Sequence, residues 1–305
     1  MSAVDLSLAC RMIRACDVAY HIGSPGGVQS SPEYLRVGFI SPPQVFVRGT
    51  DGIDACLVGQ IPEGVVVAFR GTLPLVFQGP DSPQHRSDLL RALVDWLNSA
   101  DGFQITVPGI PGKVHKGFAD ALLDLWEPIT GVLPPPSPGQ RLFVTGHSKG
   151  GSVAMLAASR LRTLLPGIAA SDLAVFTFAA PRVGDADFAS GYHAQVLQTW
   201  RFANRDDIVP HLPPDMTLLR IFGLIPGSPF LNALAAYKDT GDTQFIAWDG
   251  SIVDVDALGW WESWKLKNRR MGHLALKLLS GRVRDVLSDH VPTGGYMVNT
   301  CGGGS

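Results

Sequence analysis

The stretch LFVTGHSKGGSVAMLAASRL, residues 142–161, constrains the fold most, because it places Ser148 between two glycines where the sequence pattern changes. Residues 142–144 are an apolar run typical of a buried strand, and residues 153–161 have the small and apolar composition of a packed helix. A strand that becomes a helix within two or three residues needs a sharp turn, and side chains at Gly146 and Gly150 would collide with neighbouring backbone. We therefore expect a nucleophile elbow, G-x-S-x-G, with the Ser148 hydroxyl at the carboxyl edge of a sheet. The alternative is a strand–helix connection of the same composition that has no chemical role.

The rest of the chain alternates between strand-like and helix-like segments. Strands are predicted at 44–49, 53–72 (two strands joined at 62–64), 141–145, 173–181 and 196–204, and helices at 86–98, 116–127 and 185–194. This alternation predicts an α/β domain with a largely parallel sheet and crossover helices. In such sheets the chemistry collects outside the carboxyl ends of the strands, so partners of Ser148 should lie at other strand ends.

Composition bounds the domain count and the partners. The chain has 305 residues with 46% apolar content, enough for a sizeable core, and no linker divides it, so we expect one domain over 1–305. The Pro-rich stretch 134–139 is interpreted as a surface loop. With 25 basic and 27 acidic residues the net charge is −2, which argues against a nucleic-acid partner.

The first twenty residues do not resemble a secretory signal, because charged residues interrupt the apolar ones and no basic region precedes them. They predict an amphipathic helix packed on the body. No run approaches the ~18 apolar residues of a membrane span, since Arg, Pro and Asn break the stretch 218–237. We therefore expect no transmembrane segment, and a protein that is cytoplasmic or exported without a signal. Four cysteines give neither a disulfide-rich scaffold nor a zinc spacing, and no metal or cofactor is implied.

A serine hydroxyl becomes a strong nucleophile only beside a base, usually a histidine that an acid orients. In hydrolases with this elbow the chain order is serine, acid, histidine. The segment RFANRDDIVPHLPP, residues 201–214, leaves a predicted strand at Asp206 and Asp207. Adjacent residues point in different directions, so only one of the two can face the histidine.

The candidates for the base are the histidines after the acid. His211 has too little chain to return over Ser148. His273 is predicted in the first turn of a helix, and His290 in an irregular loop that contains glycine and proline. Because a loop can reach over the sheet edge, we favour His290 and keep His273 as the alternative.

The reaction of such a serine also requires two donors for an oxyanion. One is normally the backbone N–H of the residue after the nucleophile, here Lys149. The other comes from a loop after an early strand, and VVVAFRGT, residues 65–72, supplies Thr72 at such a strand end. An ordinary strand exit is the alternative for Thr72.

Several stretches taken together resemble the class 3, fungal-type triacylglycerol lipases. They are VAFRGT, VHKGFADAL, VTGHSKGG, TFAAPRVGDADFA and NRDDIVPHLPP, in the family's order over about 65–214. The resemblance implies an α/β-hydrolase fold and hydrolysis of carboxylic esters. It implies Ser148 as nucleophile, the aspartate before Ile-Val-Pro, Asp207, as acid, and Thr72 and Lys149 as oxyanion donors.

The same resemblance places a mobile lid at 73–94, where a plain surface insertion is the alternative. It also implies a disulfide from Cys10 or Cys16 to Cys301, and an aromatic residue after the catalytic histidine, which Tyr296 would supply. The match is weak over 215–305. A positive charge at Lys149, where many members have an apolar residue, has no explanation in the sequence.

The expected function is that of a serine esterase or lipase acting on acylglycerols, with a lipid or other ester as partner at a lipid–water interface. Other esterases of the same fold, such as a phospholipase A1, a feruloyl esterase or a polyester hydrolase, share the triad. A non-catalytic binding module of hydrolase-like fold is a further alternative.

Overall fold

The computed structural model of the protein describes residues 3–49, 52–71, 104–135, 139–165, 167–214, 236–280 and 282–302. Its main sheet has the strand order β1-β2-β3-β6-β7-β8-β9-β10. These strands are β1 (Gln44–Arg48), β2 (Asp54–Ile61), β3 (Gly64–Phe69), β6 (Arg141–His147), β7 (Leu173–Phe178), β8 (Thr199–Asn204), β9 (Asp242–Ile246) and β10 (Ile252–Asp254). A second, two-stranded sheet joins β4 (Gln104–Ile105) to β5 (Val114–His115).

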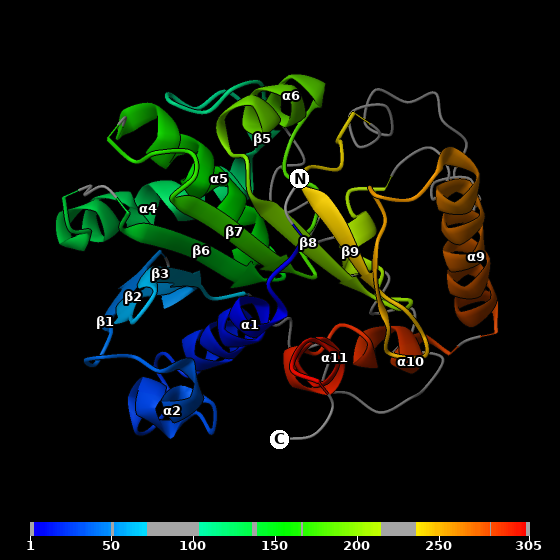
Figure 1. The fold of residues 1–305 in the computed structure, drawn as a ribbon, viewed down its shortest axis with the longest axis horizontal. Coiled ribbons are helices and arrows are strands. Elements are labelled where there is room, and N and C mark those ends of the chain that lie inside the picture. Colours follow the sequence, from blue (N-terminus) through cyan, green and yellow to red (C-terminus); the bar gives the residue numbers. More distant parts are fainter. Residues whose placement is uncertain are drawn as a thin grey trace.

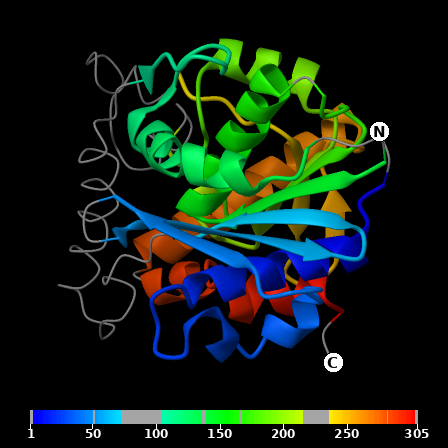
Figure 2. The same ribbon diagram turned by 90° about the vertical axis from the view of Figure 1, so that its left-hand side faces the viewer.

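Helices cover both faces of the main sheet. They are α1 (Leu6–Tyr20), α2 (Tyr34–Val37), α4 (Lys116–Val132), α5 (Lys149–Leu164), α6 (Ala186–Gln195), α9 (Trp260–Leu279), α10 (Val283–Ser288) and α11 (Val298–Thr300), with shorter turns η1 (Gly27–Ser30), η4 (Val209–His211) and η5 (Pro292–Met297). Figure 2 shows α4, α5 and α6 above the sheet and α1, α2 and the C-terminal helices below it. Helix α9 stands at the outer edge beyond β9 and β10 (Figure 1).

The central strands are parallel, as the alternation of segments predicts. The pairs β3–β6, β6–β7, β7–β8 and β8–β9 are all parallel, and the outer pairs β1–β2, β2–β3 and β9–β10 are antiparallel. Parallel neighbours need a long crossover, which the helices between β6 and β8 supply. The carboxyl ends of β6, β7 and β8 therefore meet at one edge of the sheet.

Two hydrophobic cores lie on the two faces of the sheet, and neighbouring residues of one strand contribute to different cores. Val144 and Val175 point toward α4 and α5, while Phe143 and Phe176 point toward α1. A strand that is buried on both faces reads as a continuous apolar run rather than an alternating one. The apolar run at 142–144 arises because β6 is buried on both faces of the sheet.

Helix α1 forms as the sequence predicts and buries one broad face. Its N-cap is Asp5, whose side chain accepts hydrogen bonds from the N–H groups of Ser7 and Leu8. Met12 and Ala19 are fully buried against the sheet. These opening residues are thus part of the packed body.

Several predicted elements differ in their bounds, among them the helix predicted over 116–127, which continues to Val132. The strand predicted over 173–181 ends at Phe178, because Ala179 takes a left-handed backbone conformation with φ 55° that no strand continues. The strand predicted over 196–204 begins only at Thr199. His273 does not lie in the first turn of a helix, since α9 begins at Trp260. The predicted helix at 86–98 and the predicted lid at 73–94 lie outside the described residues, and one domain over 1–305 stays a prediction.

A disulfide joins Cys10 in α1 to Cys301 near the other end of the chain. Of the two alternatives implied by the family resemblance, the structure has the one that uses Cys10. Cys16 is buried as a free thiol with its sulfur 3.3 Å from Thr145 Oγ1, and burial raises the pKa of this thiol to about 12. The disulfide ties α1 to the C-terminal segment.

Replacing both Cys10 and Cys301 with serine removes a cross-link between residues 291 positions apart. Because a disulfide restricts the unfolded chain, we expect the double variant to lose about 2–5 kcal/mol of unfolding free energy. Urea denaturation followed by circular dichroism measures the loss. Wild-type protein in reducing agent should unfold at the variant's midpoint, and a variant as stable as the oxidised wild type would contradict the prediction.

Candidate active site

Ser148 occupies a sharp turn between β6 and α5. Its backbone has φ 56° and ψ −132°, a conformation that costs energy for any residue other than glycine. A Cβ atom at Gly146 would lie 2.2 Å from the Gly150 carbonyl carbon, and one at Gly150 would lie 2.3 Å from the Phe69 carbonyl oxygen. Both glycines are therefore sterically required. The Ser148 N–H donates to the carbonyl of Phe178 at 2.9 Å, which fixes the turn to β7.

Two side chains from distant parts of the chain line up with the Ser148 hydroxyl. His290 Nε2 lies 3.1 Å from Ser148 Oγ. His290 Nδ1 lies 3.0 Å from Asp207 Oδ2 and 3.2 Å from Asp207 Oδ1. All three residues are buried. The structure thus brings together Ser148, Asp207 and His290, the three residues that the sequence selected by chain order and resemblance.

The contacts of Asp207 determine which protons the histidine carries. Tyr296 donates its hydroxyl to Asp207 Oδ2 at 2.6 Å, and the Val209 N–H donates to Asp207 Oδ1 at 2.9 Å. Burial and the nearby Asp207 raise the pKa of Tyr296 well above its ordinary value, so this hydroxyl stays protonated as a donor. The carboxylate then accepts from Nδ1–H of His290, so Nε2 is the nitrogen that accepts the Ser148 proton.

His147 positions the backbone of His290, a contact that the sequence analysis did not identify. His147 Nε2 donates to the His290 carbonyl at 2.8 Å, and Tyr20 donates its hydroxyl to His147 Nδ1 at 2.8 Å. Burial, together with the nearby His290, lowers the pKa of His147 well below its ordinary value, so the ring is neutral and uses one nitrogen to donate and one to accept. His147 stands in the motif directly before Ser148, which could have drawn attention to it. Its partners Tyr20 and His290 are over a hundred residues away in the sequence, so no local pattern indicates these contacts.

Asn204, the last residue of β8, holds the C-terminal segment against the sheet. Its side-chain amide donates to the Asp289 carbonyl at 2.9 Å, and its backbone N–H donates to the Tyr296 hydroxyl at 3.0 Å. A Cβ atom at Gly295 would lie 2.2 Å from the Asn204 amide nitrogen, so this close approach requires glycine. The residue was not among the sequence candidates.

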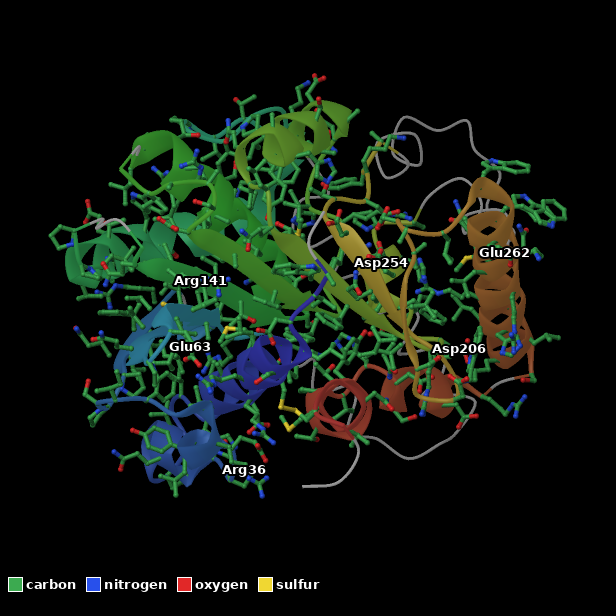
Figure 3. All side chains as sticks on the ribbon, viewed as in Figure 1. Arg36, Glu63, Arg141, Asp206, Asp254 and Glu262 are labelled. Carbon is green, nitrogen blue, oxygen red and sulfur yellow. A yellow bond between two sulfur atoms is a disulfide. The ribbon has the colours of Figure 1, made fainter. Side chains whose placement is uncertain are left out.

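Asp206 binds side chains other than His290 and lies near α9 and α10 (Figure 3). Its carboxylate pairs with Lys277 Nζ at 2.6 Å and accepts from Trp248 Nε1 at 3.2 Å. Adjacent residues therefore do point in different directions, as the sequence predicts. The pair with Lys277 gives Asp206 a structural role between the sheet and α9.

The two rejected histidines lie in other surroundings. The His273 ring packs on Trp248 with centroids 4.4 Å apart, on a helix that begins thirteen residues earlier. His211 Nε2 lies 3.3 Å from an Nη2 atom of Arg270. Neither contact involves Ser148.

The positive charge at Lys149 has a partner that the sequence did not indicate. Lys149 Nζ lies 2.7 Å from Asp54 Oδ1, at the start of β2. The side chain is therefore neutralised as part of an ion pair. As the first residue of α5, Lys149 still carries one of the N–H groups that have no acceptor within the helix. The other predicted donor, Thr72, lies outside the described residues.

Within the described ranges, no three histidine, cysteine or acidic side chains are grouped so that they could hold a metal ion. No helix among the described segments is long and apolar enough to cross a membrane.

A mainly parallel sheet with helices on both faces, a G-x-S-x-G turn after a central strand, and the order serine, aspartate, histidine define an α/β-hydrolase. The sequence profile of the family "Lipase (class 3)" matches residues 66–217, about half of the chain. The chain belongs to the class 3 lipase family.

Individual relatives agree with this assignment over shorter stretches. The lipase of Rhizomucor miehei is 33% identical over 147 residues, which are 47% of this chain and 38% of that protein. Secreted mono- and diacylglycerol lipase 1 of Fusarium solani is 33% identical over 128 residues, 39% of this chain and 36% of that protein. The solved structure of Rhizomucor miehei triacylglyceride lipase superimposes with a TM-score of 0.58 at 20% identity, covering 81% of each chain. The aligned stretches thus span less than two fifths of these two relatives, whereas the shared fold extends further.

The expected location, cytoplasmic or exported without a signal, is wrong. The Fusarium solani relative is named as a secreted enzyme, and it matches this chain over 128 residues. The expectation rested on the composition of the first twenty residues. Because these residues form α1, packed on the sheet, their composition reflects packing and carries no information on the route of export.

Replacing Tyr296 with phenylalanine removes a hydroxyl that serves two buried partners, Asp207 and the Asn204 N–H. We expect a loss of about 1–3 kcal/mol of unfolding free energy, because both groups stay buried after the hydroxyl is gone. Urea denaturation at neutral pH measures it. Tyr34→Phe is the matched control, since the Tyr34 ring packs on Phe39 at 5.9 Å and should lose under ~0.5 kcal/mol. Equal losses in the two variants would contradict the role of the Tyr296 hydroxyl.

Proposed function

We propose that this protein is a serine esterase that hydrolyses carboxylic esters, with acylglycerols as its substrates. One observation carries the proposal: the buried Asp207, His290 and Ser148 form a continuous series of contacts, 3.0 Å from carboxylate to Nδ1 and 3.1 Å from Nε2 to the hydroxyl. Membership of the class 3 lipase family supports the substrate class, because the matching relatives are named lipases or mono- and diacylglycerol lipases.

In the proposed reaction His290 Nε2 takes the hydroxyl proton while Ser148 Oγ attacks the ester carbonyl carbon. The backbone N–H of Lys149, with Thr72 as the second donor, stabilises the negative oxygen of the tetrahedral intermediate. His290 then protonates the leaving alcohol, and the acyl group stays on Ser148 as an ester. A water molecule, deprotonated by His290, attacks this acyl-enzyme and releases the carboxylic acid.

Asp207 stays ionised throughout this cycle. It orients Nδ1–H of His290 and stabilises the imidazolium that forms after each proton transfer. The donors from Tyr296 and Val209 keep both its oxygens in place. The proposal includes the segment 73–94 as a candidate lid.

We further propose that the protein acts outside the cell. The name of the Fusarium solani relative supports this location. The disulfide between Cys10 and Cys301 is also of the kind that forms in oxidising compartments and is rare in the cytosol.

Ser148→Ala is expected to lower kcat on p-nitrophenyl esters on the order of 10⁶-fold with the fold retained, because the nucleophile is gone. A fluorophosphonate should label wild-type protein at Ser148 and leave the variant unlabelled. Ser159→Ala, a buried serine of the same helix, is the matched control and should keep full activity. Labelling of another serine would move the site. Absence of turnover on every chain length, with emulsified triglyceride included, would refute the esterase.

His290→Ala is expected to fall to nearly the level of Ser148→Ala, because residues of a triad act as a unit and their losses do not add. His273→Ala should keep most activity, since its ring packs on Trp248 away from these contacts. Steady-state kinetics with one soluble ester compares the two variants, and circular dichroism checks that both are folded. Loss of activity in His273→Ala alone would assign the base to His273.

A further inference from the structure

The disulfide between Cys10 and Cys301 is accessible from outside the protein. Both cysteines are partly exposed, and both line a cavity of about 470 Å³ between α1, α2 and the end of α11. Three arginines line the same cavity, and each is ion-paired with Glu33 or Glu63: Arg11, Arg14 and Arg36. A volume of this size lies within the range of ligand pockets, so a small molecule can reach the disulfide.

The two other cysteines are shielded from such a molecule. Cys16 and Cys56 are fully buried, and burial raises the pKa of each thiol to about 12. Since the thiolate is the reactive form, neither side chain takes part in thiol exchange at neutral pH. Exchange with an external thiol is therefore directed to the disulfide.

Helix α1 connects the disulfide to the strand that precedes the nucleophile. Cys16, in the second half of α1, places its sulfur 3.3 Å from Thr145 Oγ1 in β6. Tyr20, the last residue of α1, donates its hydroxyl to His147 Nδ1 at 2.8 Å, and His147 is the last residue of β6. Cys10 thus belongs to a helix whose other half is held against β6.

On the other side of the disulfide, Cys301 ends a compact turn of the C-terminal segment. The Cys301 N–H donates to the Met297 carbonyl at 2.9 Å, and the Asn299 side-chain amide donates to the Gly295 carbonyl at 2.7 Å. These contacts join Cys301 to η5. A displacement of Cys301 is therefore passed to η5.

Turn η5 in turn holds the acid and follows the base. Tyr296 of η5 donates its hydroxyl to Asp207 at 2.6 Å, and His290 lies two residues before the turn begins. The disulfide thereby joins, through α1, the segment of His290 to the strand of Ser148. Proton transfer requires these two side chains to stay within hydrogen-bond distance.

We propose that the Cys10–Cys301 disulfide is an exchange site for a small thiol of the glutathione class, and that its redox state sets the rate of ester hydrolysis. The effect on the rate rests on the proposed function. In the oxidised protein the disulfide keeps Tyr296 and His290 in place relative to Ser148. In the reduced protein the segment is released from α1, and His290 spends part of the time out of reach of the serine hydroxyl.

The exchange is an ordinary thiol–disulfide reaction in two steps. The thiolate of the first small thiol attacks one sulfur of the disulfide, which forms a mixed disulfide and expels the other cysteine as a thiolate that takes up a proton. A second small thiol attacks the mixed disulfide and releases the remaining cysteine thiol. Two small thiols are oxidised to one disulfide, and the protein disulfide is reduced to two thiols.

Such a switch agrees with the proposed location outside the cell. The cytosol keeps thiols reduced, whereas disulfides form in the oxidising compartments that exported proteins enter. The esterase would then be slow inside the cell that makes it and would reach its full rate after export.

The exchange site is tested without any ester. Folded wild-type protein is incubated with excess reduced glutathione, free thiols are blocked with iodoacetamide, and mass spectrometry locates the label. We expect label on Cys10 and Cys301 and none on Cys16 and Cys56, because only the disulfide is accessible. Circular dichroism checks that the protein stays folded. A disulfide that remains intact under these conditions would overturn the exchange site.

The effect on the rate is tested with a soluble p-nitrophenyl ester, well below the unfolding midpoint of the reduced protein. We expect reduction to lower kcat at least about 10-fold with KM within about 2-fold, because a misplacement of 1 Å costs up to ~10²-fold in rate. Oxidised glutathione should restore kcat. A loss of stability alone would leave the kcat of the folded protein unchanged, and equal kcat in the two states would overturn the switch.

Variants assign the effect to this disulfide. Replacing both Cys10 and Cys301 with serine should give the kcat of the reduced wild type, with no response to glutathione in either form. Cys56→Ala is the matched control, since it removes a buried thiol outside the disulfide and should keep the full response. A double variant as fast as the oxidised wild type, or a Cys56→Ala protein that no longer responds, would overturn the assignment.

Failure of the proposed function gives a different result. If the oxidised wild type turns over no ester, the esterase is refuted, while the labelling experiment still decides the exchange site. The coupling is then measured from the downfield NMR signal of the His290 Nδ1–H, which its hydrogen bond to Asp207 produces and which is absent in His290→Ala. We expect this signal to broaden or disappear on reduction. Identical signals in the two redox states would refute the coupling.

Discussion

The close approach of three backbone segments around Ser148 is the constraint on which the rest of the site depends. Gly146, two residues before the serine, lies so close to Gly150 in the first turn of α5, and Gly150 so close to Phe69 at the end of β3, that a methyl group on either glycine would clash. The parallel pairing of β3 with β6, with Phe69 opposite Gly146, sets this contact. The turn is strained at Ser148 itself, and that strain persists only because the sheet and α5 are packed around it. Ser148 is thereby fixed at the edge of the sheet, and the two other proposed catalytic side chains must be positioned relative to it.

The C-terminal segment reaches that edge through contacts spread over the whole chain. His147 holds the His290 carbonyl, Asn204 holds the Asp289 carbonyl, and Tyr296 joins Asp207 to the backbone of β8. The disulfide between Cys10 and Cys301 fixes the same segment to α1. The proposed base is thus positioned less by its own short connection between α10 and η5 than by side chains from α1, β6 and β8.

The sequence predicted features that depend on neighbouring residues better than features that depend on contacts between distant parts of the chain. Ser148 and its two glycines form a local steric pattern that could be recognised from a few residues. Asp206 and Asp207 both lie just after a buried strand, and only the family resemblance selected Asp207. His290 could only be narrowed by chain order, because 142 residues separate it from Ser148 and no local pattern records the packing that brings it back. The same holds for the ion pair of Lys149 with Asp54, which lies 95 positions earlier. His273 was predicted in the first turn of a helix, whereas α9 begins thirteen residues before it at Trp260; most of residues 260–269 are exposed, so burial does not mark this first half of the helix.

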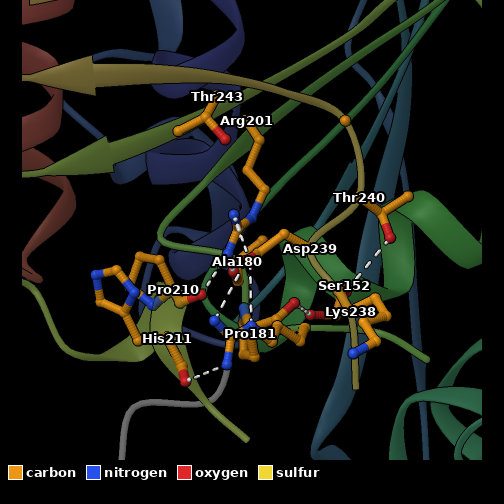
Figure 4. A network of polar contacts seen from close by, with 12 residues as sticks. Ser152, Ala180, Pro181, Arg201, Pro210, His211, Lys238, Asp239, Thr240 and Thr243 are labelled. Atoms are coloured by element: carbon orange, nitrogen blue, oxygen red, sulfur yellow. Dashed lines mark hydrogen bonds and ion pairs between the residues drawn. The ribbon is translucent and has the colours of Figure 1, made fainter. Parts of the chain in front are cut away.

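The acid of the proposed triad depends on the short turn η4, which two buried arginines hold in place. Arg201 donates to the Pro210 carbonyl, and Arg182 donates to the His211 carbonyl at 3.1 Å (Figure 4). Both acceptors belong to η4, whose Val209 N–H holds one oxygen of Asp207. The orientation of Asp207, and with it the tautomer of His290, therefore rests partly on guanidinium groups that make no contact with Ser148 among the described hydrogen bonds.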